Sequence, residues 1–213
     1  MVLVTYCHLP KTVPESAIAK WLNDLPEGKR LSVARTLVHG DGKATVIGLR
    51  LLLHLIRKLG HEQFDLAQVE FVAGKKPAIP GGPDFNISHS GDIVLCAVSE
   101  SCRVGADIEK VRPVRIAQLT RRVSSASETV GIESLEDFFS LWTKKEAVAK
   151  AAGATVAALS RVALDDERAV FDGSAWFLTR LNVPSGYIAH LARDQQQVDT
   201  ELREVEPGKL TST

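Results

Sequence analysis

The stretch Val104–Pro113, VGADIEKVRP, is the segment around which the rest of the chain can be interpreted. Its apolar residues alternate with other residues up to Ile108, a pattern that predicts a half-buried strand. Successive strand side chains point to opposite faces, so Asp107 and Glu109 share one face. Two carboxylates this close repel each other unless a proton or a cation lies between them, and a hard divalent ion is the simplest partner. A solvated polar strand edge is the alternative interpretation.

The composition describes a globular protein without a global charge. The 213 residues are 45% hydrophobic, enough for a real core in one larger or two small domains. Lys plus Arg and Asp plus Glu both number 26, so no overall field attracts nucleic acid or an anionic membrane. The three cysteines show no metal-binding spacing, and neither a secretory signal nor an apolar membrane span is recognisable. We expect a cytoplasmic protein that binds neither nucleic acid nor membrane.

Two helices are predicted in the first half of the chain. A short amphipathic helix opens at Pro14 and runs through Leu22. A longer one covers 42–59, with Asp41 as its N-cap. Apolar residues cover more than one face of the longer helix, which predicts a central, nearly enclosed position.

The first turn of the longer helix carries groups that bind phosphate. Lys43 and Thr45 lie at its N-terminus, and Lys29 and Arg30 are nearby in sequence. Free helix amides, a hydroxyl and cations together suit an anion. Ordinary solvated surface charges are the alternative.

Polar residues also mark the end of a predicted hairpin. Strands are predicted over 68–73, 85–90 and 93–99. A turn with Lys75 and Lys76 follows the first of them, and Ser88, His89 and Ser90 end the second. Hydroxyls and an imidazole at this position could grip a phosphate or an adenine nucleotide, whereas a lone histidine is more often structural.

The second half combines a basic patch with a strong helix pattern. Five cations and no acid occur between 110 and 122: Lys110, Arg112, Arg115, Arg121 and Arg122. The patch is either a solvated helix face or a docking surface for an acidic macromolecule. Residues 125–132 are predicted to form a loop.

A helix over 133–152, ended by Gly153, places Glu146 and Lys150 one turn apart. An exposed ion pair is one interpretation. Together with the two strand carboxylates, the pair also suggests a third metal ligand and a lysine that contacts phosphate. Strands are predicted over 169–172, 175–181 and 187–193, and 194–213 is expected to be a loosely held polar tail.

Four blocks of this sequence resemble the Sfp-type 4′-phosphopantetheinyl transferases. They are GKKPAIP, NISHSGD, VGADIEKVRP and FFSLWTKKEAVAKAAG, and they occur in this order between 74 and 153. The hallmarks of the family are a GKP turn, an F-N-x-SHS segment, a G-x-D-x-E strand and a W-x-x-KE-x-x-x-K helix. The joint occurrence of the last three is highly specific.

The resemblance implies a fold, a reaction and a set of site residues. The fold would be α+β, with two pseudo-symmetric halves over 1–102 and 103–193, each a small antiparallel sheet packed on a long helix, followed by the tail at 194–213. The site residues by role would be Asp107, Glu109 and Glu146 for magnesium; Glu146 and Lys150 for catalysis; and Lys29, Thr45, Lys76, Ser88, His89 and Lys150 for coenzyme A.

The implied reaction transfers the 4′-phosphopantetheine arm of coenzyme A to a serine of an apo acyl or peptidyl carrier protein. It would depend on Mg²⁺ and release adenosine 3′,5′-bisphosphate from a monomeric enzyme. The carrier would dock near the basic patch of 110–122. Two alternatives are a catalytically silent coenzyme A-binding regulator of the same fold and an unrelated α+β domain with chance motifs.

The sequence departs from the family pattern at four positions. Val123 and Ser124 stand where the family usually has two aromatics, which puts the mode of carrier docking in question. Ser32 and Ala44 replace a frequent lysine and a frequent arginine, so the 3′-phosphate would be held differently.

Overall fold

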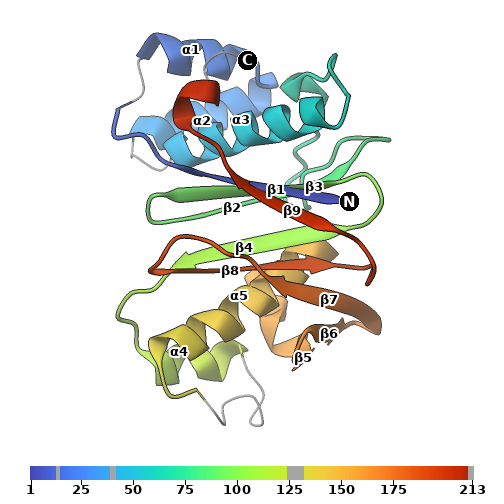
Figure 1. Ribbon diagram of the computed structural model, residues 1–213. Helices are drawn as coiled ribbons and strands as arrows, with labels where there is room; N and C mark the ends of the chain where they lie inside the picture. The colour runs from blue at the N-terminus through green and yellow to red at the C-terminus, as the bar shows by residue number, and fades with distance from the viewer. Residues whose placement is uncertain (13–14, 39–41, 124–131, 211–213) are drawn as a thin grey trace.

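The computed structural model describes residues 1–12, 15–38, 42–123 and 132–210 (Figure 1). The elements in chain order are β1 (Val2–His8), α1 (Glu15–Asn23), α2 (Glu27–Val38), α3 (Gly42–Lys58), η1 (Leu66–Gln68), β2 (Asp84–Ser90), β3 (Ile93–Ser99), β4 (Val104–Lys110), α4 (Ile116–Val123), α5 (Leu135–Ala152), η2 (Val156–Arg161), β5 (Ala163–Asp165), β6 (Arg168–Phe171), β7 (Ser174–Arg180), β8 (Tyr187–Arg193), β9 (Thr200–Glu204) and η3 (Pro207–Leu210).

The elements form two sheets between two layers of helices. One sheet has the order β2-β3-β1-β9 and the other β4-β8-β7-β6-β5. Figure 1 shows α1, α2 and α3 over the first sheet, and α4 and α5 over the second. The α+β class is therefore confirmed. The first sheet was expected to be antiparallel. It is mixed instead, because β9 pairs with β1 in parallel.

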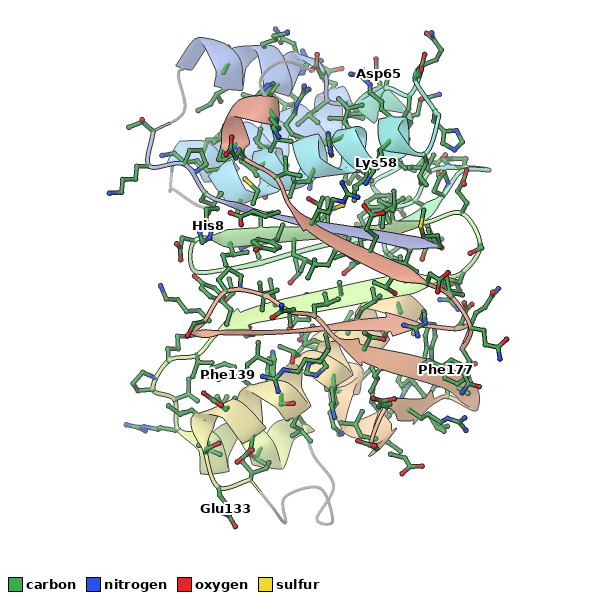
Figure 2. The ribbon with its side chains drawn as sticks, in the orientation of Figure 1. His8, Lys58, Asp65, Glu133, Phe139 and Phe177 are labelled. Atoms are coloured by element: carbon green, nitrogen blue, oxygen red, sulfur yellow. The ribbon has the colours of Figure 1, made fainter. Side chains whose placement is uncertain are left out.

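Apolar clusters hold the layers together. The first lies between α3 and the first sheet, where the two-sided apolar pattern of α3 places its leucines in the core. The second joins the two sheets, and β3 is buried at every position because it contributes to both clusters. The third packs α5 against the second sheet, and Phe139 joins its neighbour Phe138 and Ile188 of β8 in a smaller cluster (Figure 2). Each long helix is thus anchored to one sheet.

Gly105 of β4 allows α5 to lie directly on the strand. A Cβ at this position would lie 2.2 Å from the carbonyl oxygen of Ala147 and 2.3 Å from the amide nitrogen of Ala151. Any side chain would separate the helix from the strand. The helix is also well delimited, by a capping box at Ser134 and by Gly153 with φ of 73°. These features fix α5 in position relative to β4.

Several elements differ from the sequence-based expectation. Residues 68–73 do not form a strand: the chain makes η1, and pairing is limited to the single bridge of Glu70 with Ala78. The helix α2 was not predicted. The carboxyl-terminal residues are not a loose tail, since 200–204 form β9 and Leu210 is fully buried. The proposed N-cap Asp41 and most of the predicted loop at 125–132 lie outside the described residues.

None of the helices in the described ranges is both long enough and apolar enough to span a membrane. Figure 2 draws the side chains and shows how they fill the layers between helices and sheets.

Candidate active site

The facing edges of the two sheets, β2 and β4, are joined through side chains. Every second residue of β2 accepts a hydrogen bond from a backbone N–H of β4, in a constant parallel register. The four acceptors are Asp84 Oδ2 to Val104 N at 2.7 Å, Asn86 Oδ1 to Ala106 N at 2.9 Å, Ser88 Oγ to Ile108 N at 3.4 Å and Ser90 Oγ to Lys110 N at 3.1 Å. We call this row of four side chains the seam. The strand period of two repeats on both strands, so one face of β2 supplies all four acceptors.

Asp107 lies at the centre of a buried polar cluster beside the seam. Ser88 Oγ donates to Asp107 Oδ1 at 2.8 Å, and Lys150 Nζ of α5 donates to the same oxygen at 2.5 Å and to Ser88 Oγ at 3.0 Å. Asp107 is only 4% exposed. Burial raises the pKa of its carboxyl group, and Lys150 and Ser88 oppose that rise. One helix and two strands therefore meet at a single carboxylate.

Glu146 faces the same space one helical turn before Lys150. Its Oε2 lies 4.0 Å from Lys150 Nζ. Burial raises the pKa of Glu146; Lys150 lowers it, and the charges of Asp107 and Glu109 raise it again. Glu146 therefore lies within electrostatic range of both strand acids.

Glu109 completes the acidic group at the end of the seam formed by Ser90 and Lys110. Ser90 Oγ donates to its Oε2 at 2.6 Å, and Arg112 Nη1 donates to the same oxygen at 3.0 Å. Asp107 and Glu109 lie on the same face of β4, as their spacing predicted.

The acidic cluster suits a cation in its chemistry, although it is not a preformed metal cage. In the described part of the chain, no three His, Cys, Asp or Glu side chains are already arranged to hold a metal ion. Lys150 instead supplies the positive charge between the acids. Asp107 Oδ2 is nevertheless buried without a hydrogen-bond partner, which is costly for a carboxylate oxygen. A hard cation bound through carboxylate oxygens would satisfy this atom.

A cavity of about 230 Å³ opens on the α3 side of β2. Its polar lining includes Lys29, Thr45, Asn86 and His89, and its apolar lining comprises Leu49, Phe71, Pro77, Phe85 and Ile87. Lys29 Nζ lies 4.7 Å from the centre of the Phe71 ring, and burial lowers the pKa of this lysine. A cation, a hydroxyl and an imidazole beside an apolar wall suit a ligand that has both phosphate and aromatic groups.

Lys76 is the predicted site residue that lies apart from both groups. Its Nζ donates to Asp84 Oδ2 at 2.5 Å and to the carbonyl oxygen of Val104 at 2.7 Å. Lys76 and Asp84 thus hold the two backbone groups of Val104 at the start of the seam. The structure brings the other predicted residues together in two sets: Lys29, Thr45 and His89 in the cavity, and Ser88, Asp107, Glu109, Glu146 and Lys150 beside the seam.

The sequence analysis did not predict that four side chains of β2 together form the seam. Asp84 and Asn86 were not among the predicted site residues, and Ser90 was considered only as a possible ligand contact, although the alternation D-x-N-x-S-x-S was visible. Four polar residues on one face of an edge strand, next to the fully buried β3, were the signal. Phe71 was missed because its segment was expected to form a strand.

The fold and the site define the class: an α+β protein in which β2 both contacts a buried acidic cluster and lines a cavity suited to a phosphorylated ligand. Comparison with known proteins agrees with this class. Residues 103–184, which contain β4 and α5, match the model of the 4'-phosphopantetheinyl transferase superfamily. The matched part of the chain carries the G-x-D-x-E strand and the W-x-x-KE-x-x-x-K helix, and the match supports the resemblance found in the sequence.

Three curated relatives show the extent of the similarity. The 4'-phosphopantetheinyl transferase Sfp of Bacillus subtilis is 29% identical over 156 residues, which cover 68% of each chain. The 4'-phosphopantetheinyl transferase psf-1 of Bacillus pumilus is 34% identical over 137 residues, covering 59% of this chain and 56% of its own. The 4'-phosphopantetheinyl transferase AcpT of Salmonella typhi is 33% identical over 142 residues, covering 62% of this chain and 63% of its own. The aligned parts thus span between 56% and 68% of these relatives.

Proposed function

We propose that this protein transfers the 4′-phosphopantetheine arm of coenzyme A to a serine of an acyl or peptidyl carrier protein and releases adenosine 3′,5′-bisphosphate. The observation that carries the proposal is the meeting of Glu146 and Lys150 of α5 with Asp107 of β4, together with β2, which contacts Asp107 through Ser88 and also lines the cavity. The relatives described above bear the name of this activity.

Coenzyme A is proposed to lie along β2. Lys29 and Thr45 would hold the 3′-phosphate in the cavity, and His89 and Ser88 would contact the phosphates between the cavity and the seam. Lys150 would contact the pyrophosphate from α5. Lys76 remains a proposed contact, and it would have to give up one of its bonds at the seam to make it.

Asp107, Glu109 and Glu146 are proposed to hold Mg²⁺, and the unpartnered Asp107 Oδ2 supports this assignment. The ion, when bound, would neutralise charge on the phosphate oxygens, which is the main contribution to rate in such reactions.

The side chains beside the seam are arranged for the transfer itself. The carrier serine oxygen attacks the β-phosphorus of coenzyme A. A new P–O bond forms, and the bond from this phosphorus to the oxygen bridging the two phosphates breaks. Glu146 accepts the serine proton, and the burial that raises its pKa brings the carboxylate closer to the basicity required. Lys150 stabilises the negative charge on the departing phosphate.

The carrier is proposed to dock on the basic patch formed by Lys110, Arg112, Arg115, Arg121 and Arg122. Arg115 is exposed and therefore accessible to an acidic partner. Arg112 pairs with Glu109 and lies 5.6 Å from the Phe139 ring centre, which places the patch beside the acidic cluster. The side chains of Arg121 and Arg122 lie outside the described residues. Docking here would bring the carrier serine to the end of the seam formed by Ser90 and Lys110.

The proposal extends to the organisation of the whole protein. The two halves at 1–102 and 103–193 are proposed to be related by pseudo-symmetry, because each pairs one long helix with one sheet. Both sides of the site then come from one chain, so we propose a monomer acting in the cytoplasm.

A second candidate is a regulator that binds coenzyme A without transferring it. The buried Glu146 argues against this alternative, since a binder gains nothing from a second buried acid near Asp107.

Mass spectrometry of the carrier separates the two functions. The protein is incubated with coenzyme A, MgCl₂ and an apo carrier of each class. Transfer increases the carrier mass by one phosphopantetheine arm and produces adenosine 3′,5′-bisphosphate. Binding of coenzyme A with no mass change in any carrier would support the regulator instead, and absence of both would reject the coenzyme A assignment.

A further inference from the structure

Ser90 belongs to the seam but is not one of the proposed coenzyme A contacts. Its hydroxyl is bonded to Glu109 Oε2 at 2.6 Å and to the amide nitrogen of Lys110 at 3.1 Å. We propose that Ser90 is a positioning residue for the cation site: it fixes the carboxylate of Glu109 in the orientation that binds the divalent ion. This inference rests on the proposed function, because the ion belongs to that reaction.

The direction of these hydrogen bonds follows from their chemistry. The amide of Lys110 can only donate, so the Ser90 oxygen accepts from it. The single hydroxyl proton of Ser90 is then free for Glu109, which as a carboxylate can only accept. Ser90 is thereby held by the backbone of the same strand that carries Glu109. Its orientation is fixed together with that of the acid.

The same arrangement occurs one step earlier along the seam. Ser88 donates to Asp107 at 2.8 Å and accepts from the amide of Ile108 at 3.4 Å. Each serine of β2 therefore binds one acid of β4 and the backbone amide that follows it. Both strand carboxylates proposed to hold the ion are oriented by equivalent partners, as is typical of the groups that surround metal ligands.

Ser90 can be tested more cleanly than Ser88. Ser88 also contacts Lys150 and is a proposed coenzyme A contact, whereas Ser90 is not among the residues that line the cavity. Arg112 binds the same oxygen of Glu109, but its side chain is 55% exposed, so its hold on the acid is weakened by solvent. Ser90 is more buried than Arg112, and its hydrogen bond to Glu109 is the shorter of the two.

The experiment measures Mn²⁺ binding as a probe of the site, by electron paramagnetic resonance of the free ion at saturating coenzyme A. Ser90→Ala removes the hydroxyl and Ser90→Thr retains it. Ser99→Ala is the matched control, because Ser99 Oγ also accepts from a backbone amide, that of Cys102 at 3.3 Å, but lies at the far end of β3 from the acids. Thermal unfolding of each variant confirms that it is folded.

Ser90→Ala is expected to weaken Mn²⁺ binding by about 10-fold or more, as the loss of a partner of a metal ligand typically does. Ser90→Thr and Ser99→Ala should stay within about threefold of the wild type. Coenzyme A binding in EDTA should not change in any variant. Unchanged Mn²⁺ affinity in Ser90→Ala, or an equal loss in Ser99→Ala, would overturn the positioning role.

The readout also distinguishes this inference from the proposed function. A wild type that modifies a carrier while Ser90→Ala binds Mn²⁺ normally would refute the role of Ser90 alone. A wild type that binds Mn²⁺ in a Ser90-dependent manner but modifies no carrier would refute the transfer alone. A wild type that binds no Mn²⁺ refutes the positioning role directly.

Discussion

Lys150 Nζ on α5 lies 2.5 Å from Asp107 Oδ1 on β4, although 43 positions separate the two residues in the chain. This ion pair joins the helix to the strand two residues after Gly105, which allows the helix to lie directly on the strand. It also holds a cation beside a buried carboxylate whose second oxygen is unpartnered. The pair therefore defines the geometry on which the proposed chemistry depends.

Glu146→Gln should abolish most of the transfer and leave coenzyme A binding nearly unchanged. The amide has the shape of the acid but cannot accept the serine proton, and removal of a general base typically costs about 10²- to 10⁴-fold in kcat. Single-turnover transfer measured by carrier mass, together with calorimetric titration of coenzyme A, tests this. Glu146→Asp serves as the control that retains a carboxylate. Equal losses of turnover and of coenzyme A affinity would contradict the assignment of the base.

Thr45→Val should weaken the binding of coenzyme A but not of 3′-dephospho-coenzyme A. Thr45 lines the cavity with Lys29, and both are proposed to bind the 3′-phosphate. A hydrogen bond to a charged group contributes about 1.5–3 kcal/mol, so a loss of roughly 10- to 100-fold in affinity is expected for coenzyme A. Parallel titrations with the two ligands give the difference. A similar loss for both would place the 3′-phosphate elsewhere.

Arg115→Glu should raise the KM for the carrier at low ionic strength and leave the KM for coenzyme A unchanged. The exposed guanidinium of Arg115 is proposed to attract the acidic carrier, and surface attraction of this kind is screened by salt. The difference from the wild type should shrink between 50 and 500 mM NaCl. Arg35→Glu, on the distant α2, is a charge-matched control. Identical carrier KM values for the wild type and Arg115→Glu at low salt would exclude docking at this patch.

The stability of the protein should fall as the pH decreases from about 6.5, and His190→Gln should reduce that dependence. Burial is the largest cause that lowers the pKa of His190 from 6.5 to about 3, and Thr143 Oγ1 lies 2.8 Å from its Nδ1. The unfolded chain binds a proton that the folded chain excludes in this window, so each pH unit costs up to about 1.4 kcal/mol.

Urea unfolding at pH 6.5, 5.5 and 4.5 measures the effect of His190. Burial raises the pKa values of Asp107 and Glu146, and the stability that they contribute is lost as the pH rises, so they act in the opposite direction. The comparison is therefore between the pH slopes of the wild type and the variant. Equal slopes would show that His190 does not carry the dependence.

Leu210→Ala should destabilise the fold by about 2–5 kcal/mol, the usual cost of truncating a fully buried leucine. Leu210 is fully buried within the core around α3, and its carbonyl oxygen accepts from Arg50 Nη2 at 3.4 Å. Leu31→Ala, at a position 54% exposed on α2, is the matched control and should change stability little. Urea unfolding of both variants decides whether the carboxyl-terminal segment is part of the core, and equal stabilities would contradict it.

The long helices and most strands could be predicted because their patterns are local. The apolar residues of α3 and the Glu146–Lys150 spacing of α5 depend only on the helical repeat. The shared face of Asp107 and Glu109 depends only on the strand repeat. The nature of the site, an acidic group with a lysine, followed from these repeats together with the resemblance.

The partners of β2, of Lys76 and of the carboxyl-terminal strand could not be predicted in this way. A period of two shows that Ser88 and Ser90 share a face, but not that this face meets β4 through side chains. From the sequence alone, Lys76 is expected to be an exposed cation in a turn. Only the structure shows that it donates hydrogen bonds to Asp84 and to Val104. The polar sequence of β9 gives no sign that it pairs in parallel with β1.

The amino-acid sequence by itself determined which side chains share a face, because the backbone repeats of helix and strand are fixed by local geometry. Only the tertiary structure decided which faces meet. That choice depends on how buried surfaces separated by many residues fit together, such as α5 against Gly105 and the seam between β2 and β4. Only this packing brings Lys150 of α5 to Asp107 of β4 beside the seam.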